Sequence, residues 1–449
     1  MGARTYPSFG RTALPARNAV AVEALLGAPL GVLSRRRGVL AYGNGRSYGD
    51  SCQPASGTVI DVSGMNRILD FDPVTGLMDV EAGVLLSEVI AAARPHGWFP
   101  AVVPGTQFVT VAGAIANDIH GKNHHRRGTF GRQVESLRLL DSIGIHDCSA
   151  TSSPSLFAAT IGGMGLTGVI MSARIRLMKV ASVDVVERVQ AFASLAAYFD
   201  LADAADRNNE YAVAWVDQLA EGAAEGRGLL ITGNHADADA APRATLLPKP
   251  FVPFQPPFGL LGRPFLTIFN RIYHDRKART AERKVGHESF FFPLDGVRHW
   301  NRLYGPRGLF QHQSLIPEAA AHCVVPELLA ATRSAGQASF LTVLKRFGNV
   351  ASPGLLSFPR PGYTLTLDFP NRGAQTLALL ARLDAITVEA GGAVNPYKDA
   401  RMSADTFAAS FPRWAELEVM RDPAFNSAFW ERTALRLASR AVRARIAAE

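Results

Sequence analysis

Three glycine-rich segments in the N-terminal part of the chain have the composition of anion-binding loops. They are residues 42–50 (YGNGRSYGD), residues 104–121, which end in GAIANDIHG, and residues 162–168 (GGMGLTG). Glycines that follow a strand let consecutive backbone N–H groups converge on a phosphate oxygen. The first segment lacks the GxGxxG spacing that opens a Rossmann helix, and on its own it is also explained by a tight turn. Together the three segments predict a long phosphate-containing cofactor that runs between loops.

Two other groups of reactive side chains point away from metal or disulfide chemistry. His120, His124 and His125 fall within six residues, but two are adjacent and no carboxylate or cysteine supplies a complementary ligand set, so we expect no metal. The chain has three widely scattered cysteines, Cys52, Cys148 and Cys323. An odd number without metal-ligand spacing predicts reduced thiols.

The composition is that of a folded protein with a basic balance. The 449 residues suggest two or three domains at about 150 residues each, and 47% hydrophobic against 19% charged residues exclude global disorder. The net charge of +8 comes mostly from arginine, which suits phosphate ligands, although a GC-rich genome gives the same bias. No apolar leader segment and no run of about 18 apolar residues is present, so we expect a cytoplasmic protein without a membrane span.

Short strands alternating with helices must position these segments. Apolar runs predict strands at 39–42, 58–62, 76–81 and 169–178 and a hairpin of 137–140 with 145–148. Helical spacing predicts helices at 85–94, 111–119 and 156–161. Further on, strands at 211–216, 228–232, 313–316, 338–344 and 363–369 alternate with helices at 317–334 and 374–390. This second half predicts another sheet covered by helices, followed by a helical region from Ala404 that ends in an Arg-rich helix at 433–448.

The segment 247–284 combines prolines, phenylalanines and cations. Six prolines between Pro248 and Pro264 predict neither regular helix nor strand. The phenylalanines are Phe251, Phe254, Phe258, Phe265 and Phe269. The cations that follow suit the phosphate headgroups of a membrane. We interpret the segment as a mobile lid that receives a lipid chain and rests on the inner membrane face; the alternative is a loop packed on its own protein with a solvated basic rim.

The order of the motifs resembles a known family. The strings GxGRSYGD, PGTxxVTVxGAIAxDIHGKNHH and GGxGLTGxI are similar to the FAD-binding domain of vanillyl-alcohol-oxidase-type flavoproteins, and within them to the decaprenylphosphoryl-β-D-ribose 2-oxidase family. The string DIHGKNHH is highly specific. The resemblance continues through YAVAWVD at 211–217, WNRLYGPRGLFQHQ at 300–313 and YKDAR at 397–401, and it extends from about Leu33 to Arg432.

The resemblance implies an α+β flavoprotein of two lobes. Residues 1–183, completed by 393–449, would bind FAD, and residues 184–392 would form a substrate lobe with an antiparallel sheet covered by helices. The implied FAD contacts are Gly43, Asn44, Gly45, Arg46, Ser47, Tyr48, Pro104, Gly105, Thr106, Gly113, Ala116, Asn117, Ile119, His120, Gly121, Gly165, Thr167, Gly168 and Ile170. Related aldonolactone oxidases carry a histidine bonded to the flavin at the position of Arg46, so the resemblance implies non-covalent FAD here.

The resemblance also implies an activity, the oxidation of the C2 hydroxyl of a polyprenylphosphoryl-ribofuranose to the 2-keto lipid sugar. This is the first half of a 2-epimerisation toward arabinose, which a separate NAD(P)H-dependent short-chain reductase would complete. Lys398 matches the family lysine that reaches flavin and ligand, and we expect it to stabilise charge. His120 and Tyr48 would place the hydroxyl or accept its proton.

Further positions match the substrate pocket of the family, and some depart from it. The matching residues are Trp215, Gln313, Lys345, Thr366 and again Lys398. Thr366 stands where mycobacterial members have cysteine, Asn395 where the family has tyrosine, and Asn117 where cysteine is frequent. These departures leave flavin binding intact and make the identity of the lipid sugar less secure.

Two other classes of function stay open beside this interpretation. One is an aldonolactone oxidase of the D-arabinono-1,4-lactone type, or another carbohydrate oxidase, with non-covalent FAD. The other is a basic module that binds nucleic acid or membranes. The ordered glycine segments argue against a basic module, because a basic patch does not require them. We therefore expect no nucleic acid partner, and peripheral contact with the inner membrane.

Overall fold

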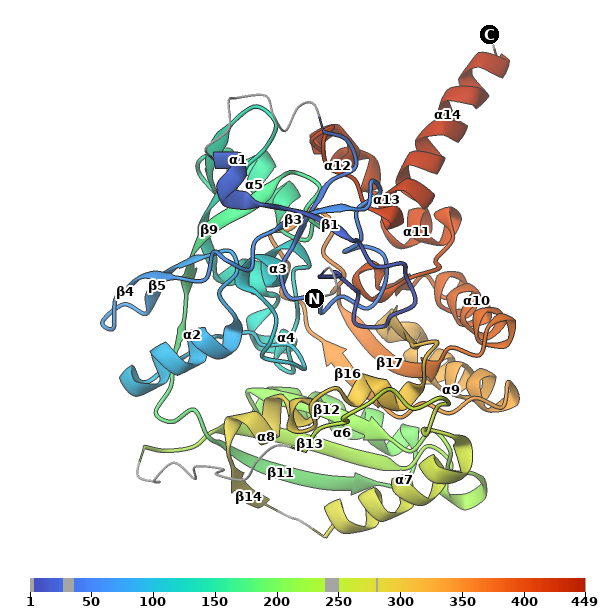
Figure 1. Ribbon diagram of the computed structural model, residues 1–449. Helices are drawn as coiled ribbons and strands as arrows, with labels where there is room; N and C mark the ends of the chain where they lie inside the picture. The colour runs from blue at the N-terminus through green and yellow to red at the C-terminus, as the bar shows by residue number, and fades with distance from the viewer. Residues whose placement is uncertain (1–3, 27–35, 239–249, 280–281, 449) are drawn as a thin grey trace.

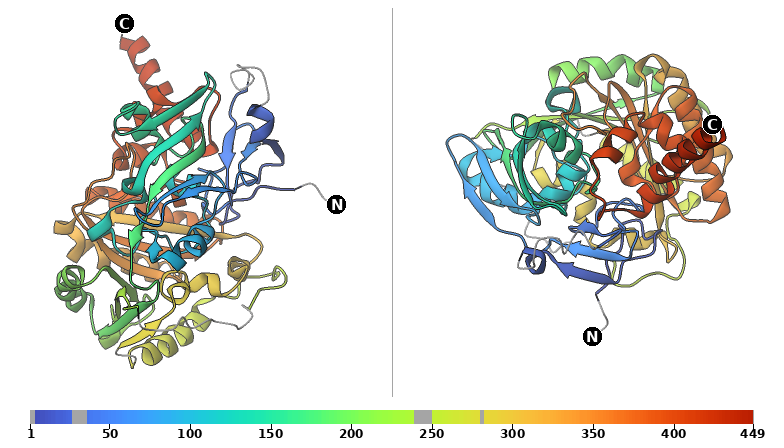
Figure 2. Two further views of the ribbon diagram at one scale, coloured as in Figure 1. Left: turned by 90° about the vertical axis from the view of Figure 1, so that its left-hand side faces the viewer. Right: turned by 90° about the horizontal axis from the view of Figure 1, so that it is seen from above.

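The computed structural model describes residues 4–26, 36–238, 250–279 and 282–448. Its glycine segments and an eight-stranded sheet occupy opposite halves of the molecule (Figure 1). The chain ends in four helices beside the half that carries the glycine segments (Figures 1 and 2). The predicted α+β class, with a large antiparallel sheet covered by helices, is confirmed.

Two sheets hold the three glycine segments. A parallel sheet has the order β1-β3-β2, and an antiparallel sheet has the order β4-β5-β9-β7-β8. The first glycine segment begins where β2 leaves its sheet, and the third leads into β9. The strands are β1 (Asn18–Ala21), β2 (Leu40–Tyr42), β3 (Thr58–Asp61), β4 (Ile68–Phe71), β5 (Leu77–Glu81), β6 (Trp98–Phe99), β7 (Val134–Leu140), β8 (Ile145–Ser149), β9 (Val169–Arg176) and β10 (Met178–Lys179). The helices are α1 (Val22–Leu26), α2 (Leu86–Ala93), α3 (Val111–Ala116), α4 (His124–Arg127) and α5 (Pro154–Thr160).

The eight-stranded sheet is antiparallel throughout, with the order β14-β11-β13-β12-β16-β17-β15-β18. Its strands are β11 (Val185–Phe192), β12 (Tyr211–Val216), β13 (Gly228–His235), β14 (Glu282–Val285), β15 (Leu309–Ile316), β16 (Thr342–Phe347), β17 (Gly362–Pro370) and β18 (Ala393–Val394). Helices α6 (Leu195–Asn208), α9 (Glu318–Ser334) and α10 (Ala374–Glu389) pack on one face. The other face is contacted by α7 (Arg263–Lys277) and α8 (His287–Phe291) near one edge and is otherwise turned toward the glycine segments.

The alternation of side chains along these strands decides which residues can do chemistry. Ala214, Leu344 and Leu365 belong to the core beneath α6, α9 and α10. Their neighbours Lys345 and Thr366 point to the opposite face, because successive side chains of a strand alternate. The sheet thus presents an apolar face to its helices and a polar, reactive face to the glycine segments.

The C-terminal helices pack against the first half of the chain. They are α11 (Ala404–Ser410), α12 (Trp414–Met420), α13 (Ala428–Arg432) and α14 (Ala434–Ala448). Phe407 and Trp430 share a core cluster with Leu40 and Leu166, and Val39 forms a parallel bridge with Phe425. The division into domains at residues 183 and 393 stays a prediction. No helix among the described residues has the length and apolar character needed to cross a bilayer.

Two predictions of local structure were wrong at one end. The helix expected over residues 111–119 ends at Ala116, because Asp118 adopts a left-handed conformation with φ of +39°. The proline-rich stretch 248–264, expected to form neither helix nor strand, has neither over residues 250–262, but α7 begins at Arg263 and β14 follows it. Pro264 lies in the first turn of α7, where proline is tolerated. Residues 247–249 and 280–281 of the segment 247–284 lie outside the described residues.

Candidate active site

A cavity of about 870 Å³ lies between the glycine segments and the polar face of the large sheet. This volume is near the upper end of the usual range for small-molecule sites. All residues predicted to bind cofactor or substrate or to act in catalysis line it, with the exception of Thr167. Thr167 is buried behind the loop, and its hydroxyl shares a 2.9 Å hydrogen bond with that of Thr160. The cavity brings the predicted residues together, while their individual roles stay predictions.

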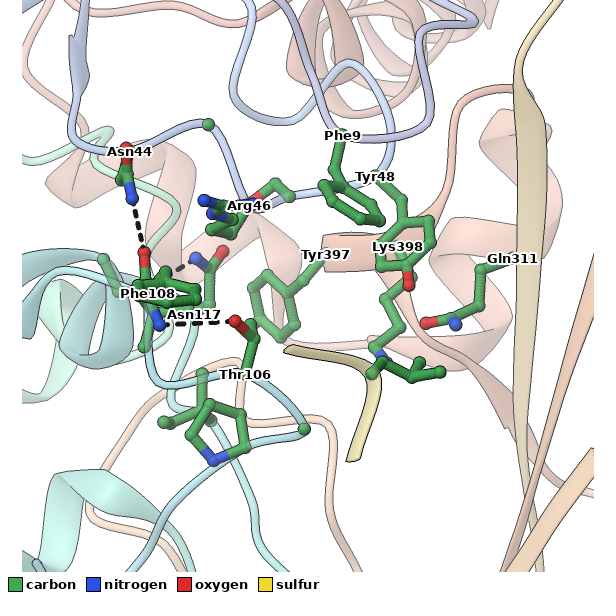
Figure 3. Close-up of a pocket in the computed structure, with 18 of the residues that line it drawn as sticks. Phe9, Asn44, Arg46, Tyr48, Thr106, Phe108, Asn117, Gln311, Tyr397 and Lys398 are labelled. Atoms are coloured by element: carbon green, nitrogen blue, oxygen red, sulfur yellow. Dashed lines mark hydrogen bonds between the residues drawn. The ribbon is translucent and has the colours of Figure 1, made fainter. Parts of the chain in front are cut away.

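The first glycine segment forms one wall, pressed against the start of α3. A β-carbon at Gly43 would lie 2.5 Å from Oγ1 of Thr110, and one at Gly45, where φ is +59°, would lie 2.0 Å from the Tyr42 hydroxyl. Only glycine therefore fits at these two positions. The side chain of Asn44 donates a 2.7 Å hydrogen bond to the carbonyl of Phe108, which ties the first and second segments together (Figure 3).

Arg46 extends from this wall into the cavity. Its guanidinium lies 5.8 Å from the ring centroid of Phe9 and 5.5 Å from that of Phe108, distances typical of cation–π contacts. Its Nε is buried and has no hydrogen-bond partner among the described residues. Burial lowers the pKa of Arg46 from its ordinary value, and the carboxylate of Asp295 partly offsets this. A buried guanidinium with an unused donor is suited to an anionic ligand.

The second glycine segment presents Asn117 and His120 at the end of α3. Thr110 caps the helix by accepting a 3.1 Å hydrogen bond from the backbone N–H of Gly113. The strained backbone of Asp118 is stabilised by its side chain, whose carboxylate accepts hydrogen bonds of 2.5 Å from both Ser352 and Ser357. This support turns the chain sharply, so that His120 faces the large sheet.

A directional chain of hydrogen bonds connects His120 to the turn before Lys398. Asn395 accepts from the backbone N–H of Tyr397 (3.0 Å), so its amide nitrogen is free to donate to Oε1 of Gln313 (2.9 Å). The amide nitrogen of Gln313 then faces Nε2 of His120 at 3.1 Å. Because an amide nitrogen can only donate, Nε2 must be the acceptor of a neutral imidazole. The proton of His120 therefore resides on Nδ1.

The tautomer of His120 determines whether the amino group of Lys345 is protonated. Nζ of Lys345 lies 3.0 Å from Nδ1 of His120 and donates at 3.3 Å to the carbonyl of Gly121. An Nδ1–H donor requires an acceptor, so the lysine must be a neutral amine. Burial, together with the charges of Lys398 and Lys122, lowers the pKa of Lys345 well below its ordinary value. Burial likewise lowers the pKa of His120 well below its ordinary value. Geometry and electrostatics agree on a neutral histidine–lysine pair.

Tyr48 and Lys398 form a second pair that lines the same cavity (Figure 3). Nζ of Lys398 lies 5.6 Å from the ring centroid of Tyr48. Burial lowers the pKa of Lys398 to about 8, against the opposing effect of the Asp368 carboxylate, and raises the pKa of Asp368 to about 7. Burial also raises the pKa of Tyr48 well above its ordinary value, so its phenol stays protonated at neutral pH. The site thus has a hydroxyl donor beside a cation.

The remaining predicted substrate positions lie on the sheet. Trp215 lines the cavity and packs edge-on against Tyr273 at a centroid distance of 5.0 Å. Thr366 is buried opposite Gln313 in the β15–β17 register and reaches the same cavity. The structure adds residues that the sequence interpretation missed, Asp368, Gln311 and Lys122. Gln311 lines the cavity, and Asp368 is buried on the same face of β17 as Thr366, so the alternation of side chains along predicted strands was the available signal.

The three clustered histidines point in different directions. His125 contacts the carbonyl of Asn209 at 3.1 Å, and His124 packs against Phe347 at a ring distance of 4.6 Å. His120 alone of the three lines the cavity. Among residues 4–26, 36–238, 250–279 and 282–448, no three histidine, cysteine or acidic side chains converge in a way that could hold a metal ion.

Comparison with known proteins identifies the class first. Residues 32–149 match the family model described as an FAD binding domain. This stretch contains the first two glycine segments, and the chain is therefore an FAD-linked oxidoreductase. Its cavity fits such a cofactor, because the glycine walls admit close backbone approach and Arg46 offers an unused buried donor.

Relatives that match most of the chain narrow the class to a family. The chain is 37% identical over 407 residues to the decaprenylphosphoryl-beta-D-ribose oxidase of Mycolicibacterium smegmatis, covering 86% of each protein. It is 34% identical over 373 residues to an uncharacterized protein of Streptomyces coelicolor, covering 79% of this chain and all of that protein. The L-gulonolactone oxidase of Mus musculus is 31% identical over 136 residues, about 30% of each chain. The chain belongs to the decaprenylphosphoryl-β-D-ribose oxidase family.

Proposed function

We propose that the protein oxidises the C2 hydroxyl of a polyprenylphosphoryl-ribofuranose to the 2-keto lipid sugar. The observation that carries this proposal is that the neutral His120–Lys345 pair and the Tyr48–Lys398 pair line one cavity. Oxidation of a secondary alcohol needs a proton acceptor for the hydroxyl and a cation to stabilise developing negative charge. The family member from Mycolicibacterium smegmatis, named for decaprenylphosphoryl-β-D-ribose, supports the choice of substrate class.

The histidine–lysine pair supplies the route for the hydroxyl proton. Nε2 of His120 accepts the proton from the substrate oxygen, once the substrate hydroxyl has replaced the amide of Gln313 as its hydrogen-bond donor. Nδ1 passes its own proton to the neutral amine of Lys345, which becomes an ammonium group. The imidazole ends in the opposite tautomer and carries no net charge. One proton thus moves from substrate to Lys345, 3.0 Å beyond the ring.

Tyr48 and Lys398 hold the other side of the reacting centre. The phenol of Tyr48 stays protonated and donates a hydrogen bond that orients the sugar hydroxyls. Lys398, protonated at pH 7, stabilises negative charge that develops near the bound isoalloxazine. Bound FAD supplies the acceptor for the hydride of the alcohol carbon.

The cofactor is held without a covalent bond in this proposal. Arg46 occupies the position of the covalent histidine of aldonolactone oxidases, and a guanidinium cannot form that linkage. Its unused Nε donor and its charge would instead contact the pyrophosphate. The protein would therefore release its flavin on denaturation.

The proposal includes two further partners, one that consumes the product and one that delivers the substrate. A separate NAD(P)H-dependent short-chain reductase would reduce the 2-keto lipid and complete the epimerisation. An anionic inner membrane face would deliver the lipid. The phenylalanines at 251, 254, 258 and 265 are each more than half exposed, and the cations of α7 lie close in sequence.

Turnover with purified protein tests the proposal. We expect farnesylphosphoryl-β-D-ribofuranose to bleach the flavin absorbance under anaerobic conditions and to give a 2-keto product by mass spectrometry. D-Arabinono-1,4-lactone and L-gulonolactone should react at least about 10²-fold more slowly, since neither presents a prenyl phosphate to the cavity. Faster turnover of the lactones would replace the lipid-sugar proposal with the carbohydrate-oxidase alternative.

A further inference from the structure

Lys122 is a buried cation that the proton route does not use. It lies two residues after His120 in the DIHGKNHH string and lines the same cavity. Its ammonium donates to the carbonyl of Phe290 and lies 4.4 Å from the centroid of that ring and 5.9 Å from that of Phe291. The chain has seven lysines, and Lys122, Lys345 and Lys398 all face this one cavity. Because Lys345 is neutral, Lys122 and Lys398 are the two lysines that bring positive charge to the cavity, and this charge favours an anionic ligand.

The protein does not neutralise this charge with a carboxylate. Glu187 is the acidic group whose charge acts on Lys122. Its carboxylate already accepts hydrogen bonds from Lys277 at 2.6 Å and from Arg283 at 3.0 Å. No ion pair joins Lys122 to an acidic side chain in the part of the chain that the structure describes. A buried charge without a directly paired anion is costly, and a ligand anion reduces that cost.

Part of the cavity lining near Lys122 is apolar and aromatic. Its walls there are Val213, Trp215, Ile231, Tyr273 and Phe291. Tyr273 lies on α7 and continues an aromatic row along that helix, 6.0 Å from Phe269, which lies 6.2 Å from Phe265. Phe265 is 52% exposed, so the row leads from the cavity to the surface. This arm suits a hydrocarbon chain and offers little to a free sugar.

Lys122 is close to both of the other regions: it follows His120 by two residues, and its Nζ lies 5.9 Å from the ring of Phe291 in the apolar arm. A prenylphosphoryl sugar likewise carries its phosphate between the sugar and the hydrocarbon chain. We infer that Lys122 binds the phosphodiester of the substrate and that the arm of Trp215, Ile231 and Tyr273 holds the first isoprene units. This inference rests on the proposed function, and it assigns the phosphate subsite within it.

Equilibrium binding to the FAD-loaded protein tests the inference without turnover. The probes are farnesyl phosphate, farnesol and inorganic phosphate, measured by titration calorimetry. We expect wild-type protein to bind farnesyl phosphate about 10- to 100-fold more tightly than farnesol, the scale of one charge-assisted contact. Lys122→Gln keeps an N–H donor for Phe290 but no charge, and should lose this preference while binding farnesol unchanged. Lys122→Arg should retain part of it.

Lys179 provides a matched control outside the cavity. It also donates to a backbone carbonyl, that of His96 at 3.0 Å, and lies 4.7 Å from the ring of Trp98. Lys179→Gln should leave both affinities unchanged. Equal loss of farnesol and farnesyl phosphate binding in Lys122→Gln would show a packing role and overturn the inference. Loss of flavin absorbance in that variant would assign Lys122 to the cofactor and overturn it as well.

Failure of the proposed function gives a different pattern. In that case wild-type protein shows no turnover of farnesylphosphoryl-ribofuranose, whatever the Lys122 variants do. If turnover occurs and the phosphate preference persists in Lys122→Gln, the function stands and the phosphate subsite lies elsewhere. Tight binding of inorganic phosphate that Lys122→Gln abolishes, without any preference for farnesyl phosphate, would refute the prenyl arm.

Discussion

Replacing Lys398 with methionine removes the cation beside Tyr48 while nearly preserving side-chain volume. Loss of one preorganised electrostatic group commonly costs about 10²- to 10³-fold in the rate of the chemical step. The lysine lies in the short helix η7 (Pro396–Lys398), whose start is capped by Asn395 rather than by Lys398 itself. The fold should therefore survive the substitution. We expect flavin reduction in Lys398→Met to slow by about 10²-fold at pH 7.

The pH dependence separates a cation from a base at this position. With a pKa of about 8, Lys398 is about nine-tenths protonated at pH 7 and about one-tenth protonated at pH 9. If the charged form acts, the rate of flavin reduction falls about tenfold per pH unit above 8. Lys122 faces the same cavity and its pKa is also lowered to about 8, so a decline caused by Lys398 must persist in Lys122→Gln. Tyr48 stays protonated, and the hydrogen-bond geometry makes His120 and Lys345 neutral.

Stopped-flow reduction under anaerobic conditions at saturating lipid substrate measures both effects. Lys398→Met should be slow and should lack the alkaline decline. Asp368→Asn should move the decline to lower pH, because the Asp368 charge raises the pKa of Lys398. A wild-type rate that rises through pH 8 would make neutral Lys398 the proton acceptor. A methionine variant within threefold of wild type would remove Lys398 from the mechanism.

Three other predictions concern the cofactor, the packing of the site and the membrane. Acid precipitation should release all flavin into the supernatant, and a fluorescent protein band on a denaturing gel would contradict non-covalent binding. Arg46→Ala should raise the Kd for FAD about 10- to 100-fold, as measured by titration of the apoprotein. Arg432→Ala removes the arginine paired with Asp50 and one of the two arginines at Asp399, which keeps Arg401. It should lower the free energy of unfolding by about 3 kcal/mol in a denaturant titration, whereas a loss below about 1 kcal/mol would show that the pairs are solvated. Replacing Phe254, Phe258 and Phe265 with serine should weaken co-sedimentation of the protein with anionic liposomes. Serine at Val74 and Val419, which are each 84% exposed elsewhere on the protein, should not weaken it. Equal liposome binding by the two variants would show that these phenylalanines do not contact the membrane.

The sequence predicted strands and helices well where the pattern was local. The continuous apolar run of β12, the alternation in β17 and the apolar spacing in α9 each depend on neighbouring residues, so these elements could be predicted directly. The end of α3 could not be predicted from its neighbours, because Ser352 and Ser357, which hold the strained Asp118, lie more than 230 positions away in the sequence. Pro264 was taken as a helix breaker, although proline in the first turn of a helix is compatible with it.

The protonation states of the site were also beyond the sequence. His120, Gln313, Lys345 and Asn395 come from different parts of the chain, and only their spatial order fixes which nitrogen carries the proton. The departure at Asn395 was visible in the sequence, but its meaning was not. In the structure its amide orients Gln313, so an amide at this position sets the tautomer of His120. A side chain without an amide would leave that orientation undetermined.

The packing of residues 45–50 against residues 397–401 explains why Tyr48 and Lys398 lie close together. A β-carbon at Gly49 would lie 1.5 Å from the carbonyl oxygen of Asp399, so the segments GRSYGD and YKDAR touch backbone to backbone. Arg432 then bridges them, with contacts of 2.8 Å to Asp50 and 2.7 Å to Asp399. Each segment therefore places its reactive residue relative to the other, one position before Gly49 and one before Asp399. Through Arg432, the C-terminal helices help to hold Tyr48 and Lys398 in place, although in the described structure none of the side chains of these helices lines the cavity.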